Sequence, residues 1–223
     1  LLSKQSVTRI VIPTPKGITL HLEILEATLE KGVASCAVKK YSGDDPDVTN
    51  GTLVYAKVSF GGNTKERKIL IDGGIGVGRI TKPGLEQPIG AAAINRVPRQ
   101  MITDAVIEVM EEYDYYGEIF VQISIPEGVE LAKKTFNPRL GIEGGISVLG
   151  TSGIVEPMSE EALIASIRLE MQMHRNNGAE YLVISPGNYG TTYLSQNFQV
   201  NLEKAVKCSN YLGKTIDMAV EMH

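Results

Sequence analysis

The chain has no tryptophan, and aromatic residues make up only 6% of its 223 residues. A hydrophobic core must therefore rest on Ile, Val, Leu and Met, over a length that suits one large domain or two small ones. No apolar run reaches the ~18 residues that a membrane-spanning helix needs. The net charge of −4 gives no general attraction for nucleic acid, whose partners usually carry a basic surface. We expect a globular protein that binds neither nucleic acid nor membrane.

Cysteine is also scarce, with Cys36 and Cys208 the only two. Without a recognisable signal peptide, two cysteines indicate reduced thiols in a cytoplasmic protein. The three histidines form no His-x-x-x-His pattern, and the sequence contains no Cys-x-x-Cys pair. The sequence therefore predicts neither a metal site nor a redox centre.

Hydrophobic periodicity divides the chain into two differently built parts. In the first part, the pattern predicts strands at 7–12, 18–27, 33–39, 52–60, 67–71 and 119–125, a helix at 98–115 and a short helix at 127–134. In the second part, it predicts strands at 146–149 and 181–185 and helices at 159–176 and 202–212. The predicted fold is α+β with α/β: an N-terminal mixed sheet-and-helix lobe over residues 1–140, then a smaller Rossmann-like α/β lobe over residues 141–223.

Residues 72–84 hold five glycines beside two cations, Arg79 and Lys82. Glycine lets the backbone adopt positive φ or pass close to another group. A dinucleotide fingerprint is excluded, because Pro83 and Gly84 prevent the helix that must follow it. A phosphate-binding P-loop is excluded as well, since no Gly-Lys-Ser/Thr closes the segment. Two interpretations stay open: a loop that approaches an anionic ligand, or a hairpin in which two strands cross tightly.

Three further segments make this pattern specific. Residues 35–51 read SCAVKKYSGDDPDVTNG, residues 93–102 read AINRVPRQMI, and residues 145–158 read GISVLGTSGIVEPM. Together with residues 72–84 they resemble the cobalt-precorrin-5B C-1-methyltransferase family of anaerobic cobalamin biosynthesis. The resemblance runs from about Thr14 to the C-terminus. Members of this family usually begin earlier and continue past His223, so we expect this chain to be part of a longer protein.

The resemblance implies a transferase that moves a methyl group from S-adenosylmethionine to carbon 1 of a corrinoid. The sulfonium carries the activated methyl group, so the protein's task is to hold the two reactants in line and exclude water. We assign the corrinoid to the first lobe and S-adenosylmethionine to the second. The partner is then a small-molecule corrinoid, and whether the protein is a homo-oligomer is left open.

Loops at the carboxyl ends of parallel strands bind ligands in open α/β sheets, and two loops of the second lobe fit this rule. One follows the strand at 181–185, and the other follows its expected neighbour at 146–149. The S-adenosylmethionine candidates are Gly150, Thr151, Ser152, Gly153, Ser185, Gly187, Asn188 and Gly190. The competing interpretation is that both loops are ordinary connections built from turn residues.

The acetate and propionate arms of a corrinoid need cationic partners, and arginine suits bidentate contact with a carboxylate. The cationic candidates are Arg79, Lys82, Arg96 and Arg99, joined by Lys39 and Lys40. Gly74, Gly76 and Gly78 are candidates for close approach of the backbone to the ring. The competing interpretation of each cation is a solvated surface side chain.

The acidic segment Asp44, Asp45 and Asp47 is the candidate catalytic group. A carboxylate there could remove a proton from the macrocycle as carbon 1 is methylated. It could also coordinate a hard cation, or simply form a turn, since Asp and Pro favour turns. Two other functions stay open: a tetrapyrrole-binding module without chemistry, and a metal-dependent phosphoryl or hydrolytic enzyme that uses the 44–47 loop.

Overall fold

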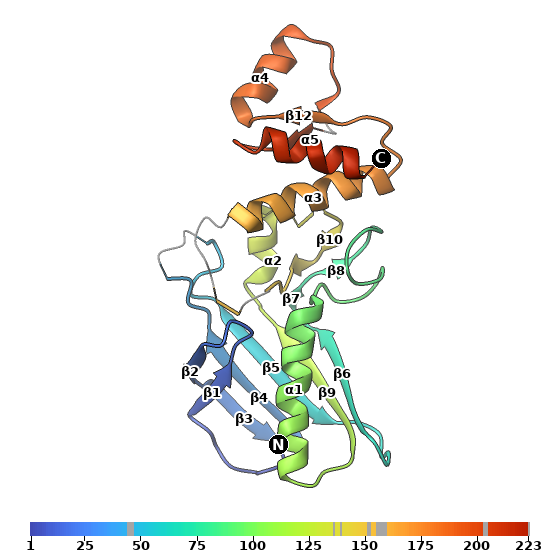
Figure 1. The fold of residues 1–223 in the computed structure, drawn as a ribbon. Helices are drawn as coiled ribbons and strands as arrows, with labels where there is room; N and C mark the ends of the chain where they lie inside the picture. The colour runs from blue at the N-terminus through green and yellow to red at the C-terminus, as the bar shows by residue number, and fades with distance from the viewer. Residues whose placement is uncertain are drawn as a thin grey trace. The chain divides into compact units, whose positions relative to one another are not determined.

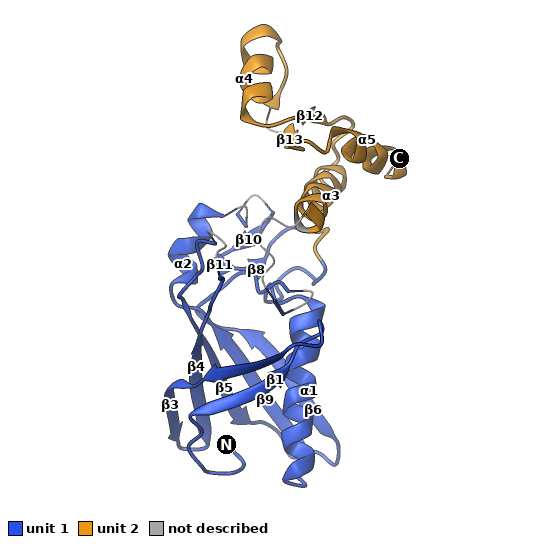
Figure 2. Ribbon diagram, turned by 60° about the vertical axis from the view of Figure 1, so that its left-hand side comes forward, with its two compact units in different colours: residues 1–82, 86–155 blue, residues 83–85, 156–223 orange. Residues whose placement is uncertain are grey.

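The computed structural model describes residues 1–43, 47–135, 137–138, 140–150, 153–154, 160–202 and 205–222. The chain forms two compact units, shown in different colours in Figure 2. Unit 1 comprises residues 1–82 and 86–155, and unit 2 comprises residues 83–85 and 156–223. The boundary expected near residue 140 therefore falls inside unit 1.

A five-stranded sheet is the main element of unit 1. Its strand order is β3 (Leu25–Glu30), β4 (Val33–Lys39), β5 (Leu53–Phe60), β9 (Gly117–Ser124) and β6 (Arg67–Gly73). Neighbouring strands are antiparallel except β6 and β9, which run parallel. Because side chains alternate between the two faces of a strand, each strand contributes to both faces of this sheet.

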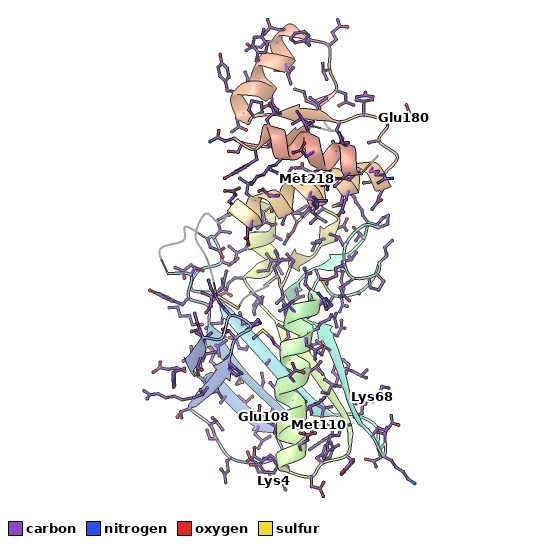
Figure 3. The ribbon with its side chains drawn as sticks, in the orientation of Figure 1. Lys4, Lys68, Glu108, Met110, Glu180 and Met218 are labelled. Atoms are coloured by element: carbon purple, nitrogen blue, oxygen red, sulfur yellow. The ribbon has the colours of Figure 1, made fainter. Side chains whose placement is uncertain are left out.

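Helix α1 (Arg96–Glu112) covers one face of the sheet, which we call the packed face (Figure 1). Ile102, Val106 and Met110 recur at four-residue spacing, so they lie on one side of α1 and pack into the core. Ile119, Val121 and Ile123 point to the same core from alternate positions of β9. Figure 3 labels Met110, whose side chain is fully buried.

A hairpin of β1 (Arg9–Pro13) and β2 (Thr19–Glu23) precedes the sheet. Thr14 and Gly17 form its turn, in which Gly17 takes a φ of 79° and its amide donates to the carbonyl of Thr14. The strand expected at 18–27 is divided in the structure, because β2 ends at Glu23 and β3 begins at Leu25.

The glycine-rich segment continues from β6 into two very short strands. β7 (Gly76–Val77) pairs in parallel with β11 (Gly145–Ile146), and β8 (Arg79–Ile80) pairs antiparallel with β10 (Ile142–Glu143). Between β9 and β10 lie α2 (Gly128–Leu131) and the 3₁₀ helix η1 (Ala132–Lys134). The expectation that residues 146–149 form a strand of the second lobe is wrong, because β11 belongs to unit 1.

Unit 2 consists of helices around a short parallel pair of strands. Its elements in order are α3 (Glu160–Asn176), β12 (Val183–Ser185), α4 (Asn188–Asn197), β13 (Ala205–Lys207) and α5 (Leu212–Glu221). Its core is formed by Ile167, Met171, Val206, Cys208 and Met218, the last of which is labelled in Figure 3.

The helix predicted at 202–212 is wrong. Val206 lies in β13, beside β12, and α5 begins only at Leu212. The segment Ala205–Lys207 is too short for its hydrophobic pattern to distinguish a strand from a helix. The chain as a whole is a mixed α and β protein with several sheets, as expected. Within the described ranges, no helix has both the length and the apolar character that a membrane crossing requires.

Candidate functional site

Several of the segments singled out in the sequence meet at one end of the five-stranded sheet, which we call the loop end. Strands β4, β6 and β9 finish there at Lys39, Gly73 and Ser124, and β5 begins there at Leu53. The register places these four positions within three residues of one another along the sheet. The acidic loop and the glycine-rich segment thus both leave the sheet at its loop end.

The glycines at 76 and 78 lie where backbones pack against each other. A Cβ on Gly76 would lie 1.7 Å from the carbonyl oxygen of Ile125, and one on Gly145 would lie 2.3 Å from the carbonyl carbon of Gly76. A Cβ on Gly78 would lie 2.3 Å from a methyl group of Ile142. Close packing around Gly76, and of Gly78 against Ile142 and Gly145, therefore favours glycine at both positions, and their contact with a ligand stays a prediction.

Gly74 lies against side chains rather than backbone. A Cβ there would lie 2.2 Å from Oγ of Ser124 and 3.0 Å from the amide carbon of Gln122. The loop after β6 can rest on these two side chains of β9 only because residue 74 has no side chain of its own.

Arg79 folds back onto the strand that precedes it. Its Nη1 donates to Oδ1 of Asp72 at 2.6 Å, and its Nη2 donates to Oδ2 of Asp72 at 2.8 Å and to the carbonyl of Gly73 at 2.7 Å. Hydrogen bonds from Arg79 hold the pKa of Asp72 below its ordinary value. The guanidinium is thus engaged within the chain, although its side chain is 42% exposed. Nothing in the sequence pointed to Asp72 as its partner.

Arg99 is a backbone clamp. Its Nε donates to the carbonyl of Ile94 at 2.8 Å, and its Nη1 donates to the carbonyl of Ile71 at 3.0 Å. A longer bond from Nη2 reaches the carbonyl of Ala92. Burial lowers the pKa of Arg99, while Asp72 opposes that change. Arg99 thereby connects the start of α1 to strand β6.

The other predicted cations have different surroundings. Arg96 pairs with Glu86 at 3.5 Å through a side chain that is 83% exposed, and Lys82 is not free either. Lys40 donates to Asp47 and to Oγ1 of Thr49. Lys39, at the end of β4, is exposed and has no partner among the described residues.

Asp47 closes a turn. Its Oδ1 accepts hydrogen bonds from the amide of Thr49 at 2.8 Å and from Oγ1 of Thr49 at 2.7 Å. Burial alone would raise the pKa of Asp47, but the hydrogen bonds from Lys40 and Thr49 outweigh it and lower that pKa. A carboxylate with a lowered pKa is a weaker base. Asp44 and Asp45 lie outside the described residues.

The loop between β12 and α4 has the geometry expected at the carboxyl end of a parallel strand. Ser185 is fully buried, and its Oγ donates to the carbonyl of Gly187 at 2.9 Å. Gly187 takes a φ of 126°, and no atom lies within 4 Å of where its Cβ would be. Gly190 packs onto Ser185, whose Oγ would lie 2.4 Å from an added Cβ. No side chain of the described residues caps the start of helix α4, so its first amide groups could bind a ligand.

Asn188 and Lys207 connect the two parallel strands at this loop. The Nζ of Lys207, at the end of β13, donates to Oδ1 of Asn188 at 2.6 Å. Lys207 was not singled out from the sequence, because residues 202–212 were expected to be a helix. Tyr189, beside them, is 87% exposed and also escaped notice.

The other half of the predicted S-adenosylmethionine site is placed elsewhere. Gly150 and Gly153 belong to unit 1, and Gly153 lies over Thr14. The expectation that residues 146–149 are the neighbour of the strand at 181–185 is wrong, because β12 pairs with β13. Thr151 and Ser152 lie outside the described residues.

A cavity of about 580 Å³ lies on the packed face of unit 1. Its walls come from the N-terminal segment, the β1–β2 hairpin, β3 to β5 and α1, and they include Ile10, Ala34, Cys36, Val58 and Val109. Burial raises the pKa of the Cys36 thiol. Of the predicted site residues that the structure describes, none lines this cavity, and its apolar walls do not suit a polyanion.

Comparison with known proteins identifies the family of this chain and several of its relatives. The family model described as CbiD matches residues 1–157. The cobalt-precorrin-5B C(1)-methyltransferase of Ruminiclostridium cellulolyticum is 52% identical over 220 residues, which are 99% of this chain and 56% of the relative. The enzyme of the same name from Alkaliphilus metalliredigens is 45% identical over 99% of this chain and 57% of its own length. The chain thus spans somewhat more than half the length of these curated relatives.

A solved structure is also similar. The crystal structure of the cobalamin biosynthesis protein CbiD from Archaeoglobus fulgidus is 31% identical, with a TM-score of 0.51. The match covers 98% of this chain and 66% of that chain. Because the family model covers more than half of the chain and the relatives are this similar, the chain belongs to the CbiD family.

Proposed function

We propose that this chain is part of an S-adenosylmethionine-dependent methyltransferase that methylates carbon 1 of cobalt-precorrin-5B in the anaerobic cobalamin pathway. The observation that carries the proposal is the 52% identity, over 99% of the chain, to a protein named for this reaction. The cytoplasmic location remains a prediction from the sequence, and whether the protein is a homo-oligomer remains open.

We further propose that unit 2 is Rossmann-like and binds S-adenosylmethionine at the loop between β12 and α4. The parallel pair, the crossover through α4 and the open space at Gly187 support this placement. The uncapped first turn of α4 suits a carboxylate, since helix N-termini attract anions. Thr151 and Ser152, with Gly150 and Gly153, stay predicted contacts.

When bound, S-adenosylmethionine supplies an activated methyl group on a sulfonium, so the chain itself needs no nucleophile. The residues of this chain would bind and orient the two reactants and keep water away from them. Lys207 holds Asn188 at the edge of the loop, which fixes one polar group beside the open space at Gly187. Because the pKa of Asp47 is lowered, we expect it to support the acidic loop rather than remove a proton.

The placement in unit 2 is tested by calorimetric titration of S-adenosylmethionine into the wild-type chain and two variants. Gly187→Val puts a side chain into the open space, and we expect the dissociation constant to rise at least about tenfold. Gly178→Val is the matched control: Gly178 lies in the same unit, has a positive φ of 78° and has nothing within 4 Å of its added Cβ. We expect Gly178→Val to bind like the wild type. Equal affinity in all three proteins would contradict this placement.

A further inference from the structure

We propose that the face of the five-stranded sheet opposite α1, around the middle of β5, β9 and β6 in unit 1, is the binding surface for the corrinoid substrate. This inference rests on the proposed function for the identity of the ligand. It assigns the contacts to Lys57, Phe120 and Gln122, which the sequence did not single out.

The core of unit 1 lies on the packed face of the sheet, against α1. Val54, Ala56 and Val58 of β5 pack toward α1, so the alternate residues Tyr55, Lys57 and Ser59 point the other way. The β1–β2 hairpin lies on the packed side as well, since Ile10 of β1 lines the cavity there together with Ala34 and Val58. We call the face that carries Tyr55 and Lys57 the open face.

The strand register arranges the open face in rows. Ser35 lies opposite Lys57, Lys57 lies opposite Gln122, and Gln122 lies opposite Asp72. With strands about 4.8 Å apart, this polar row of four residues spans about 14 Å. Residues directly opposite each other share a face, so one flat ligand could contact the whole row.

An apolar row lies beside the polar one. Phe120 is opposite both Ser59 and Leu70, and Phe120 and Leu70 are 37% and 36% exposed. An aromatic ring with its face in water gives a flat, apolar ligand a surface on which to stack. A macrocycle with an apolar ring and polar arms fits an apolar row bordered by a polar one.

The charges on the polar row suit carboxylate arms. Lys57 is exposed, and neither its ammonium group nor the amide of Gln122 has a partner among the described residues. Asp72 does not oppose an anion there, because Arg79 neutralises it through two hydrogen bonds. Lys39, on the same face at the end of β4, adds a second cation that has no partner in the described part of the chain.

Two further contacts limit where the ring can lie. Glu26, on β3, accepts a hydrogen bond from the hydroxyl of Tyr55 at 2.5 Å and would repel an anionic arm. The ring should therefore lie toward β9 and β6, away from β3. On that side the glycine-rich loop rests on Gln122 through Gly74, so the loop borders the surface on which we place the ring.

Two of the cations expected from the sequence are already bound within the chain. Arg79 donates to Asp72 and to a backbone carbonyl, and Arg99 donates to backbone carbonyls. Lysines that have no intramolecular partner can bind a carboxylate without first breaking a bond within the chain. Lys57 meets this condition, and it lies in the middle of the row.

The test measures the binding of two probes to the full chain by absorbance titration. Cobyrinic acid presents free carboxylates, and its fully esterified methyl ester presents none. Lys57→Gln should weaken cobyrinic acid binding about two- to fivefold, which corresponds to one exposed ion pair. It should leave ester binding unchanged, because the ester has no charge to lose. Phe120→Ala should weaken both probes, since it removes the stacking surface.

Lys65→Gln is the matched control. Lys65 is an exposed lysine in the loop between β5 and β6, at the end of the sheet opposite the loop end. The change in charge is the same, so a general electrostatic effect would weaken binding in both variants. We expect Lys65→Gln to bind both probes like the wild type, with melting temperatures equal to those of Lys57→Gln.

The outcomes separate this inference from the proposed function. Methylation by the wild type, with Lys57→Gln and Phe120→Ala binding both probes unchanged, would overturn the open face and leave the function standing. Binding of cobyrinic acid that depends on Lys57, without methylation, would support the open face and contradict the function. Equal weakening in Lys57→Gln and Lys65→Gln would also overturn the inference.

Discussion

Three stretches of backbone pack against one another at Gly76, which is one of the glycines of the segment 72–84. Gly76→Ala would force a Cβ to within 1.7 Å of the carbonyl oxygen of Ile125 at a φ of 76°. We expect the free energy of unfolding to fall by about 3 kcal/mol or more. The backbone at Ile125 must move to make room for the Cβ, and the alanine is also strained at a positive φ. Urea unfolding monitored by circular dichroism measures the change.

Gly17→Ala is the control for that change. Gly17 has a φ of 79°, close to that of Gly76, but nothing lies within 4 Å of its added Cβ. Its substitution should therefore cost about 1 kcal/mol, from backbone strain alone. If both variants lose the same stability, the close packing of β7 against α2 and β11 is not what requires glycine at position 76.

Single residues also mark the limit of sequence reasoning. Arg79 was a fair candidate for an anion site, because an arginine beside glycines has the same sequence whether it binds a ligand or Asp72. Only the fold brings Asp72 and Arg79 into a bidentate pair. The two interpretations left open for the glycines share this ambiguity, and the backbone contacts at Gly76 favour tight packing.

At the scale of elements, long periodic segments were predictable and short ones were not. The strand at 33–39 and the helix at 159–176 match β4 and α3, because each has a pattern several residues long that only one structure satisfies. β13 and α4 were missed. Their apolar residues are too few to set a period, so partners distant in sequence decide their structure.

Unit 2 offers a direct test of β13. Val206 is fully buried beside β12, and Val220 on α5 is 72% exposed. Val206→Ala should lower the free energy of unfolding of unit 2 by about 2 kcal/mol, because it leaves a cavity in the core. Val220→Ala should change it by less than about 0.5 kcal/mol. Thermal unfolding of both variants checks this, and equal effects would contradict the placement of β13 in the core.

The whole molecule combines two units with different architectures. Unit 1 provides a twisted sheet with one packed face and one open face, and unit 2 provides a parallel strand pair with an open loop at its carboxyl end. The sequence predicted a mixed α and β protein and the family to which the chain belongs. It did not predict that unit 1 extends past residue 140, because β11 is too short to show that its partner is β7.

Methyl transfer is the measurement that tests the account most directly. The chain is incubated with cobalt-precorrin-5B and S-adenosylmethionine carrying a ¹³C-labelled methyl group, and the corrinoid is examined by NMR and mass spectrometry. We expect the label at carbon 1 of the ring. A label that stays on S-adenosylmethionine, while the Ruminiclostridium cellulolyticum relative transfers it under the same conditions, would contradict the proposed activity of this chain.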